Sequence, residues 1–77
     1  MRARELLKRY RNPDRERMID ENVHSAIGRR ALKLIFIDDV SLWDTAEAVG
    51  MVYSTFTDNY YKKWLPELFE HFGEGED

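Results

Sequence analysis

Four acidic residues that lie close together in the sequence are the first candidates for a chemical site. Asp38, Asp39, Asp44 and Glu47 carry carboxylate oxygens, which divalent metal ions accept as ligands. Acidic residues at such spacings are also typical of the end of one helix and the first turn of the next, and we expect this second role. The chain contains no cysteine, which excludes a thiol nucleophile and a cysteine-ligated zinc. The sequence therefore predicts no metal site.

Side chains for nucleophilic or acid–base catalysis do not come together in any motif. His24 and His71 are far apart in the sequence. Ser41 and Ser54 lack the flanking glycines of a nucleophile elbow, and the chain has no glycine-rich loop of the kind that binds phosphates. We therefore expect a protein that is not an enzyme and uses no cofactor.

The charges are distributed unevenly along the chain. Residues 1–33 carry ten basic and five acidic side chains, whereas residues 34–77 carry two basic and ten acidic ones, and the net charge is −3. A basic stretch beside an acidic one is typical of proteins that contact nucleic acid or that carry an acidic interaction tail. Such charges also suit the solvated faces of small helices, so both interpretations stay open at this point.

Length and composition predict one small domain. The longest apolar run, residues 34–37, is too short to span a membrane, and the N-terminus lacks the apolar segment of a signal peptide. Ten aromatic residues argue against a disordered chain. We expect a single cytoplasmic domain over residues 1–77 with no membrane contact, and we expect its acidic end, residues 73–77, to be disordered.

The spacing of the apolar residues predicts an all-α fold, a small bundle of four or five helices. A first helix is expected over residues 2–11, after which Asn12 would cap the next helix and Pro13 would begin it. This second helical stretch covers residues 13–37 and contains Gly28, which either breaks it into two helices or lets a neighbour pack closely. Its apolar stripe consists of Ile19, Val23, Ile27, Ala31, Leu34 and Ile35.

A short helix is predicted to begin at Ser41 and to end before Gly50. Ser41 and Asp44 form a capping-box pair at its start, and Gly50 suits the left-handed position just past a helix end. Ser54 can then cap a helix over residues 55–64. Two short helices joined by a turn that contains glycine are the arrangement of a helix-turn-helix unit.

Pro66 interrupts the helical pattern near the C-terminus. It either kinks the preceding helix or begins a last one over residues 67–72. The apolar residues between Trp64 and Phe72 share one helical face, which either packs back on the bundle or forms a homodimer. Of these two arrangements we expect the first.

Four residues at fixed spacing fit the geometry of a helix-turn-helix. Ala46 is small where the first helix must approach the second, and Gly50 provides the sharp turn. Met51 follows as an apolar turn residue that reaches the core, and Phe56 anchors the second helix. The spacing therefore predicts two helices that cross closely and leave the outer side of the second one free.

The segment SLWDTAEAVGMVYSTFTDNYYKKW resembles the helix-turn-helix of small bacterial, plasmid and phage regulators. The nearest likenesses are the plasmid TrfB/KorA-type repressors and the phage regulators related to region 4 of sigma factors. In those proteins an apolar helix, here ALKLIFID, precedes the motif. The TrfB-like resemblance also includes the glycine, the apolar residue after it and the ending Lys62-Lys63-Trp64, and it covers about residues 31–64.

What the resemblance implies is a sequence-specific DNA-binding transcription regulator whose recognition helix, about residues 54–64, lies in the major groove of double-stranded DNA. The residues that would face base edges and phosphates are Tyr53, Ser54, Thr55, Thr57, Asp58 and Tyr61. Lys62 and Lys63 would reach phosphates, and further phosphate contacts would come from Arg2, Arg4, Lys8 and Arg9.

Two other functions remain open at this point. The chain could be a phage-type protein-interaction module that binds the host transcription machinery, for which the acidic C-terminal part and the aromatic face speak. It could also be a packaging protein similar to a small terminase subunit, in which a helix-turn-helix belongs to an oligomer. A fold alone does not decide among these functions.

Overall fold

The computed structural model of the protein describes residues 8–73, and every regular element in that range is a helix. In chain order these are α2 (Asn12–Asn22), α3 (Ala26–Phe36), α4 (Leu42–Ala48), α5 (Tyr53–Asn59), the π-helical turn η1 (Tyr60–Trp64) and α6 (Leu65–Gly73). The predicted all-α bundle is therefore confirmed. Across the described range, the helices are too short and too polar to cross a membrane.

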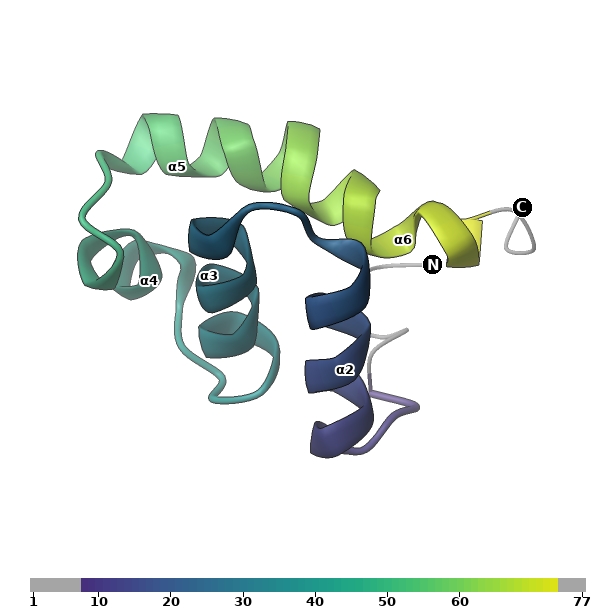
Figure 1. The fold of residues 1–77 in the computed structure, drawn as a ribbon. Helices are drawn as coiled ribbons and strands as arrows, with labels where there is room; N and C mark the ends of the chain where they lie inside the picture. The colour runs from purple at the N-terminus through teal and green to yellow at the C-terminus, as the bar shows by residue number, and fades with distance from the viewer. Residues whose placement is uncertain (1–7, 74–77) are drawn as a thin grey trace.

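The helices form two layers (Figure 1). One layer is a long rod, because α5, η1 and α6 follow one another without a break. In the other layer α2 and α3 lie side by side and run in opposite directions, and α4 packs against both α3 and α5. The core lies between the layers. Its buried apolar side chains are Ile19, Val23, Ala31, Leu32, Ile35, Phe36, Ala46, Phe56, Tyr60, Trp64 and Leu68.

The stretch over residues 13–37 is two helices, and the break falls at residues 23–25 rather than at Gly28. The Ser25 hydroxyl accepts a hydrogen bond from the Gly28 N–H at 3.1 Å and so caps α3. At the end of α2, the Arg29 guanidinium donates to the carbonyls of Val23 and His24 at 2.9 and 3.0 Å. Side chains therefore provide hydrogen-bond partners for backbone groups at both helix ends of this corner.

The break also changes which residues face the core. A stripe continued without interruption from α2 would bury Ile27, but that side chain is 49% exposed, so its prediction as a stripe residue is wrong. Leu32, outside the predicted stripe, is fully buried instead. The three extended residues of the corner rotate α3 relative to α2, because helical periodicity carries across a segment only while the helix is continuous.

Gly28 serves the second of the two roles open to it, close packing. A Cβ atom built at this position would lie 2.6 Å from Cδ1 and from Nε1 of the Trp64 indole. Real Cβ atoms essentially never approach other heavy atoms so closely. The missing side chain therefore lets the rod lie directly on the first turn of α3.

The start of α2 differs from prediction by one residue. The N-cap is Arg11, which forms no side-chain capping bond, and Asn12 is already helical. Residues 8–10 form a turn, so the last part of the helix predicted over residues 2–11 is wrong. Residues 2–7 of that helix and residues 74–77 of the acidic end lie outside the described range, whereas Gly73 belongs to α6.

Pro66 neither begins a separate helix nor ends the rod. The turn before it is wide, and the Leu65 N–H donates to the Tyr60 carbonyl five residues back. Proline has no N–H and its ring crowds the carbonyl four residues earlier, so a π-helical turn is a suitable place to accommodate it.

The wide turn also keeps one row of large side chains on the buried side of the rod. Phe56, Tyr60, Trp64 and Leu68 are four residues apart and all are buried. In a regular α-helix such a row drifts by about 40° per step, because four residues turn slightly further than one full turn. A π-helical turn rotates less per residue and offsets this drift.

Candidate nucleic-acid interface

The helix α4 begins as the sequence predicts. The Ser41 hydroxyl accepts a hydrogen bond from the Asp44 N–H at 3.1 Å, which satisfies one of the free donors at the helix start. The Thr45 hydroxyl donates to the Ser41 carbonyl at 2.7 Å, so this fully buried polar side chain has a partner. The hydroxyls of Ser41 and Thr45 therefore both stabilise the first turn of α4 by hydrogen bonds.

The turn after α4 has the hydrogen bonds of a Schellman motif. The Met51 N–H donates to the Ala46 carbonyl at 2.9 Å, and the Gly50 N–H donates to the Glu47 carbonyl at 3.1 Å. Gly50 has a φ of +74°, a left-handed conformation that costs a glycine nothing but strains other residues. The prediction for Gly50 is confirmed. The turn changes the direction of the chain within residues 49–52, after which α5 begins.

The inner sides of α4 and α5 pack as their spacing predicts. Ala46 and Phe56 are both buried, and Met51 is packed against the core. The Phe56 ring meets the Trp64 indole edge-on at a centroid distance of 5.5 Å, and it lies nearly parallel to the Tyr60 ring at 6.1 Å. The two helices are thus fixed to each other and to the rest of the rod.

The outer side of α5 and η1 is exposed. We call this surface the outer face. Its exposed members are Val52, Tyr53, Ser54, Thr55, Asp58, Tyr61, Lys62 and Lys63, and Thr57 is half-buried beside them. The structure therefore brings together on one rod all the residues between 53 and 63 that the sequence assigns to DNA contact.

Three details of the outer face differ from a simple reading of the sequence. Ser54 does not cap α5, because the N-cap is Val52 and no side chain bonds there. The Thr57 hydroxyl donates to the Ser54 carbonyl at 3.1 Å. The half-buried Asn59 amide donates to the Thr55 carbonyl at 3.0 Å. Both of these side-chain donors are therefore engaged within the helix.

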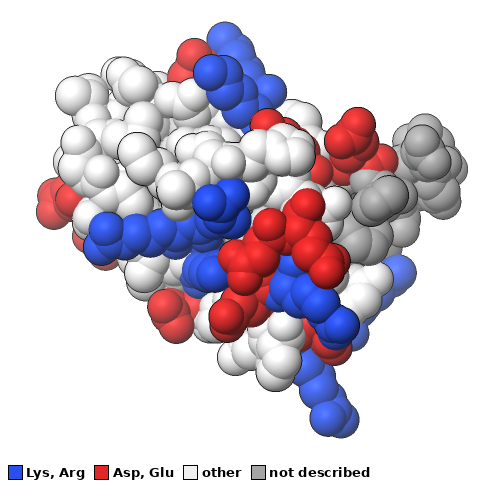
Figure 2. Space-filling view, in the orientation of Figure 1, with Lys and Arg blue, Asp and Glu red and all other residues white. Residues whose placement is uncertain are grey.

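The charges of the outer face lie toward its C-terminal end. Lys62 pairs with Asp58 one turn earlier at 2.9 Å, and both side chains remain largely exposed. Lys63 forms no ion pair with any acidic residue in the range 8–73. Residues 52–57 carry no charge at all. The surface over α5 is accordingly mostly uncharged in Figure 2, with basic and acidic side chains together at the upper edge of the molecule.

An exposed aromatic pair lies where α4 meets α5, and it was missed at the level of the sequence. The Trp43 indole is 56% exposed and the Tyr53 ring 38% exposed, and their centroids are 4.8 Å apart. The helical periodicity of α4 could have indicated this exposed pair. Trp43 lies off the row on which Thr45 and Ala46 are buried, so its ring has no place in the core.

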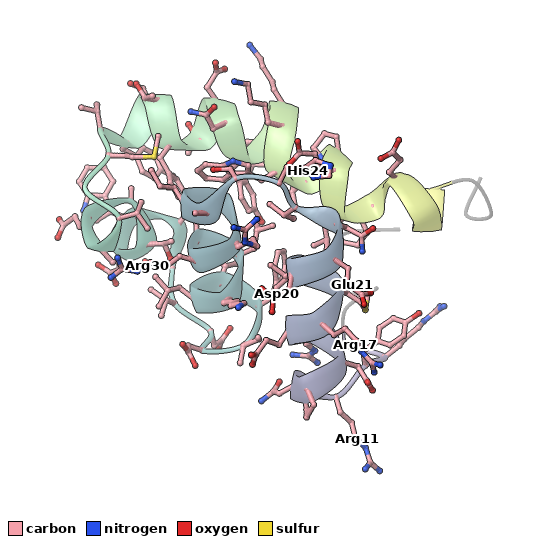
Figure 3. The ribbon with its side chains drawn as sticks, viewed as in Figure 1. Arg11, Arg17, Asp20, Glu21, His24 and Arg30 are labelled. Atoms are coloured by element: carbon pink, nitrogen blue, oxygen red, sulfur yellow. The ribbon has the colours of Figure 1, made fainter. Side chains whose placement is uncertain are left out.

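The described basic residues that precede α2 are not brought to this surface. Lys8 and Arg9 belong to the turn that precedes α2, and α2 begins at the end that is far from the rod (Figure 1). Arg2 and Arg4 lie outside the described residues. In Figure 3, Arg11 extends from the lower end of α2 and Arg17 from about the middle of that helix.

Several cations of α2 and α3 are held within the fold. Arg15 donates to the carbonyls of Tyr10 and Phe36 at 2.8 and 2.9 Å, Arg17 pairs with Asp14, and Lys33 pairs with Asp20. Figure 2 accordingly shows basic and acidic side chains mixed over this part of the molecule. The exposed Arg30 is different, since it extends from α3 toward the side where α4 lies (Figure 3).

The acidic residues Asp38, Asp39 and Asp44 lie at helix ends. Asp38 and Asp39 follow α3, where the Asp38 N–H donates to the Lys33 carbonyl, and Asp44 lies in the first turn of α4. Within the part of the chain that the structure describes, no three histidine or acidic side chains are grouped so that they could hold a metal ion.

Comparisons with known protein families, with curated proteins and with solved structures find no match.

Proposed function

We propose that the protein is a small cytoplasmic DNA-binding regulator without catalytic activity, in which α4 and α5 act as a helix-turn-helix and the outer face enters the major groove of double-stranded DNA. The observation that carries the proposal is the glycine turn between α4 and α5. It buries Ala46 and Phe56 on the inner sides of the two helices and leaves the outer face open. An exposed helix held by a second helix is the element that most often reads the major groove.

The side chains of the outer face support a polyanionic partner. Lys62 and Lys63 extend from consecutive positions of η1 and can each neutralise a phosphate, while the hydroxyls of Ser54, Thr55 and Tyr61 can donate to phosphates or base edges. The pair between Lys62 and Asp58 is exposed and therefore weak, so a phosphate can replace the carboxylate as its partner. Arg30 adds a further exposed cation beside α4.

The test is a titration of the full chain against duplexes selected from a random pool, followed by fluorescence anisotropy at several salt concentrations. If two lysines neutralise phosphates, the logarithm of the affinity should fall with the logarithm of the salt concentration with a slope of about −2 or steeper. Lys63→Gln should weaken binding and make this slope shallower by about 0.9.

The matched control is Arg17→Gln. It removes the same charge from an exposed position of α2, away from the rod, and should leave the slope unchanged. Equal effects of the two substitutions would show that only net charge matters, which would contradict a specific role of the outer face. Failure of the pool to yield any duplex that binds at low salt would refute DNA binding altogether.

A second candidate is favoured by one observation, the exposed pair of Trp43 and Tyr53. Large aromatic rings are enriched at protein–protein interfaces, where they bury much area with few rotatable bonds. The alternative function is therefore a module that binds the host transcription machinery. Sedimentation with purified bacterial RNA polymerase tests it. A stoichiometric complex that is lost in Trp43→Ala, with no duplex binding, would favour this function over the first.

A further inference from the structure

The two ends of the outer face differ in the groups that they offer to DNA. Residues 58–63 contain all of its charged side chains. Residues 52–57 offer only apolar and hydroxyl-bearing side chains, and we call them the uncharged half. Val52 is exposed over 71% of its surface, although it is an apolar residue at the N-cap of α5. A chain that exposes valine at the tip of a helix leaves methyl groups where a partner can contact them.

Most groups that read bases by hydrogen bonds are missing from the uncharged half. Arginine and lysine recognise guanine, asparagine and glutamine recognise adenine, and carboxylates accept from cytosine. None of these residue types occurs between residues 52 and 57. The nearest amide is engaged within the helix, since Asn59 donates to the Thr55 carbonyl, and the nearest carboxylate, Asp58, lies outside the uncharged half.

Besides the hydroxyls of Tyr53, Ser54 and Thr55, the remaining chemistry is apolar, and serine and threonine hydroxyls can bond to more than one base. Thr57 uses its hydroxyl proton on the Ser54 carbonyl, so its donor is satisfied within the helix. Val52 and Thr55 are both exposed, and both side chains carry methyl groups. The one base substituent in the major groove that favours contact with methyl groups is the 5-methyl of thymine.

We propose that the uncharged half recognises the 5-methyl groups of thymines, with Val52 as the main contact, and that the DNA sites of this protein carry thymine under the N-terminal end of α5. This inference rests on the proposed function. It assigns the two ends of the outer face separate tasks. Lys62 and Lys63 supply affinity through phosphates, and the uncharged half supplies preference among bases.

The experiment replaces thymines by deoxyuridine, one at a time, in a duplex selected by the full chain. Deoxyuridine pairs like thymine but lacks the 5-methyl group. Loss of one buried methyl should weaken binding about fourfold, the equivalent of about 0.8 kcal/mol. In Val52→Ala, the same replacement should cost little, because the methyl groups that contact thymine are already gone. Val52 is exposed, so this variant should fold as the unmodified chain does.

Lys63→Gln separates this inference from the function on which it rests. That variant should bind every duplex more weakly but keep the fourfold penalty for deoxyuridine. If a duplex binds with normal salt dependence and every thymine tolerates replacement, the thymine inference is overturned while DNA binding stands. If Val52→Ala retains the full penalty, another residue reads the methyl group and the role of Val52 is refuted. If no duplex binds at low salt, the proposed function fails and this inference fails with it.

Discussion

Substitution of Gly50 by alanine tests the turn on which the candidate interface depends. Gly50 has a φ of +74°, and a Cβ atom at this position would meet nothing within 4 Å. The substitution therefore introduces no clash with other residues, and its effect comes from the backbone alone. A left-handed conformation costs an L-residue about 1–2 kcal/mol.

Part of this cost is offset in the unfolded chain. Alanine has fewer unfolded conformations than glycine, which favours folding by about 0.4–1 kcal/mol. We therefore expect Gly50→Ala to lower the free energy of unfolding by about 1 kcal/mol. In a domain of this size that corresponds to a fall in Tm of roughly 4–8 °C.

The assay is urea unfolding followed by circular dichroism, with Gly50→Asn as the matched variant. Asparagine tolerates the left-handed region better than alanine, so Gly50→Asn should be less destabilised while the dependence on urea stays the same. An alanine variant as stable as the unmodified chain, or more stable, would refute a left-handed residue at this turn.

Three further predictions, which use four substitutions, test separate contacts. Gly28→Ala would place a Cβ atom 2.6 Å from two atoms of the Trp64 indole, and we expect this overpacking to lower the free energy of unfolding by about 1–3 kcal/mol. An unchanged urea midpoint would contradict the close approach of the rod to α3. Ser41→Ala removes the oxygen that caps α4 and should lower the free energy of unfolding by about 1 kcal/mol in the same assay. Ser54→Ala, at a helix start without a side-chain cap, should lower it much less. Equal losses in the two variants would contradict the assignment of the caps. Asp58→Asn frees Lys62 and removes a negative charge from the outer face, so the Kd for a selected duplex should fall severalfold at low salt; weaker binding would indicate that the carboxylate itself contacts a base.

The elements with strong local signals could be predicted from the sequence. Ser41 and Gly50 mark the two ends of α4, because a capping hydroxyl and a left-handed glycine act within a few residues of chain. The inward positions of Ala46 and Phe56 follow from helical spacing. These local signals also define most of the candidate site, since the outer face is the opposite side of the same helix.

Features that depend on distant contacts could not be predicted in this way. The corner at residues 23–25 has no proline or glycine, and it is held in part by the Arg29 side chain from the following helix. The role of Gly28 depends on Trp64, which is far away in the sequence and reaches α3 only once the rod is packed. The π-helical turn before Pro66 accommodates the proline and also keeps the row of large side chains on the buried side of the rod. The sequence pattern shows the proline but not the packing of that row.

The positions of the basic residues are a third case. Their number near the N-terminus suggests a cationic surface, but Arg15 and Lys33 are used in contacts within the fold. Lys8 and Arg9 lie away from the rod. Charge counted along a sequence does not show which charges share a face, because that depends on how the helices pack.

The most direct test of the central claim is a titration of the ¹⁵N-labelled chain with a selected duplex, followed through its backbone amide resonances. Contact through the outer face predicts that the amides of residues 52–63 shift or broaden first, while those of residues 14–20 in α2 stay in place. Shifts concentrated in α2, or a chain whose amides ignore the duplex, would contradict the claim that α5 and η1 form the surface that binds DNA.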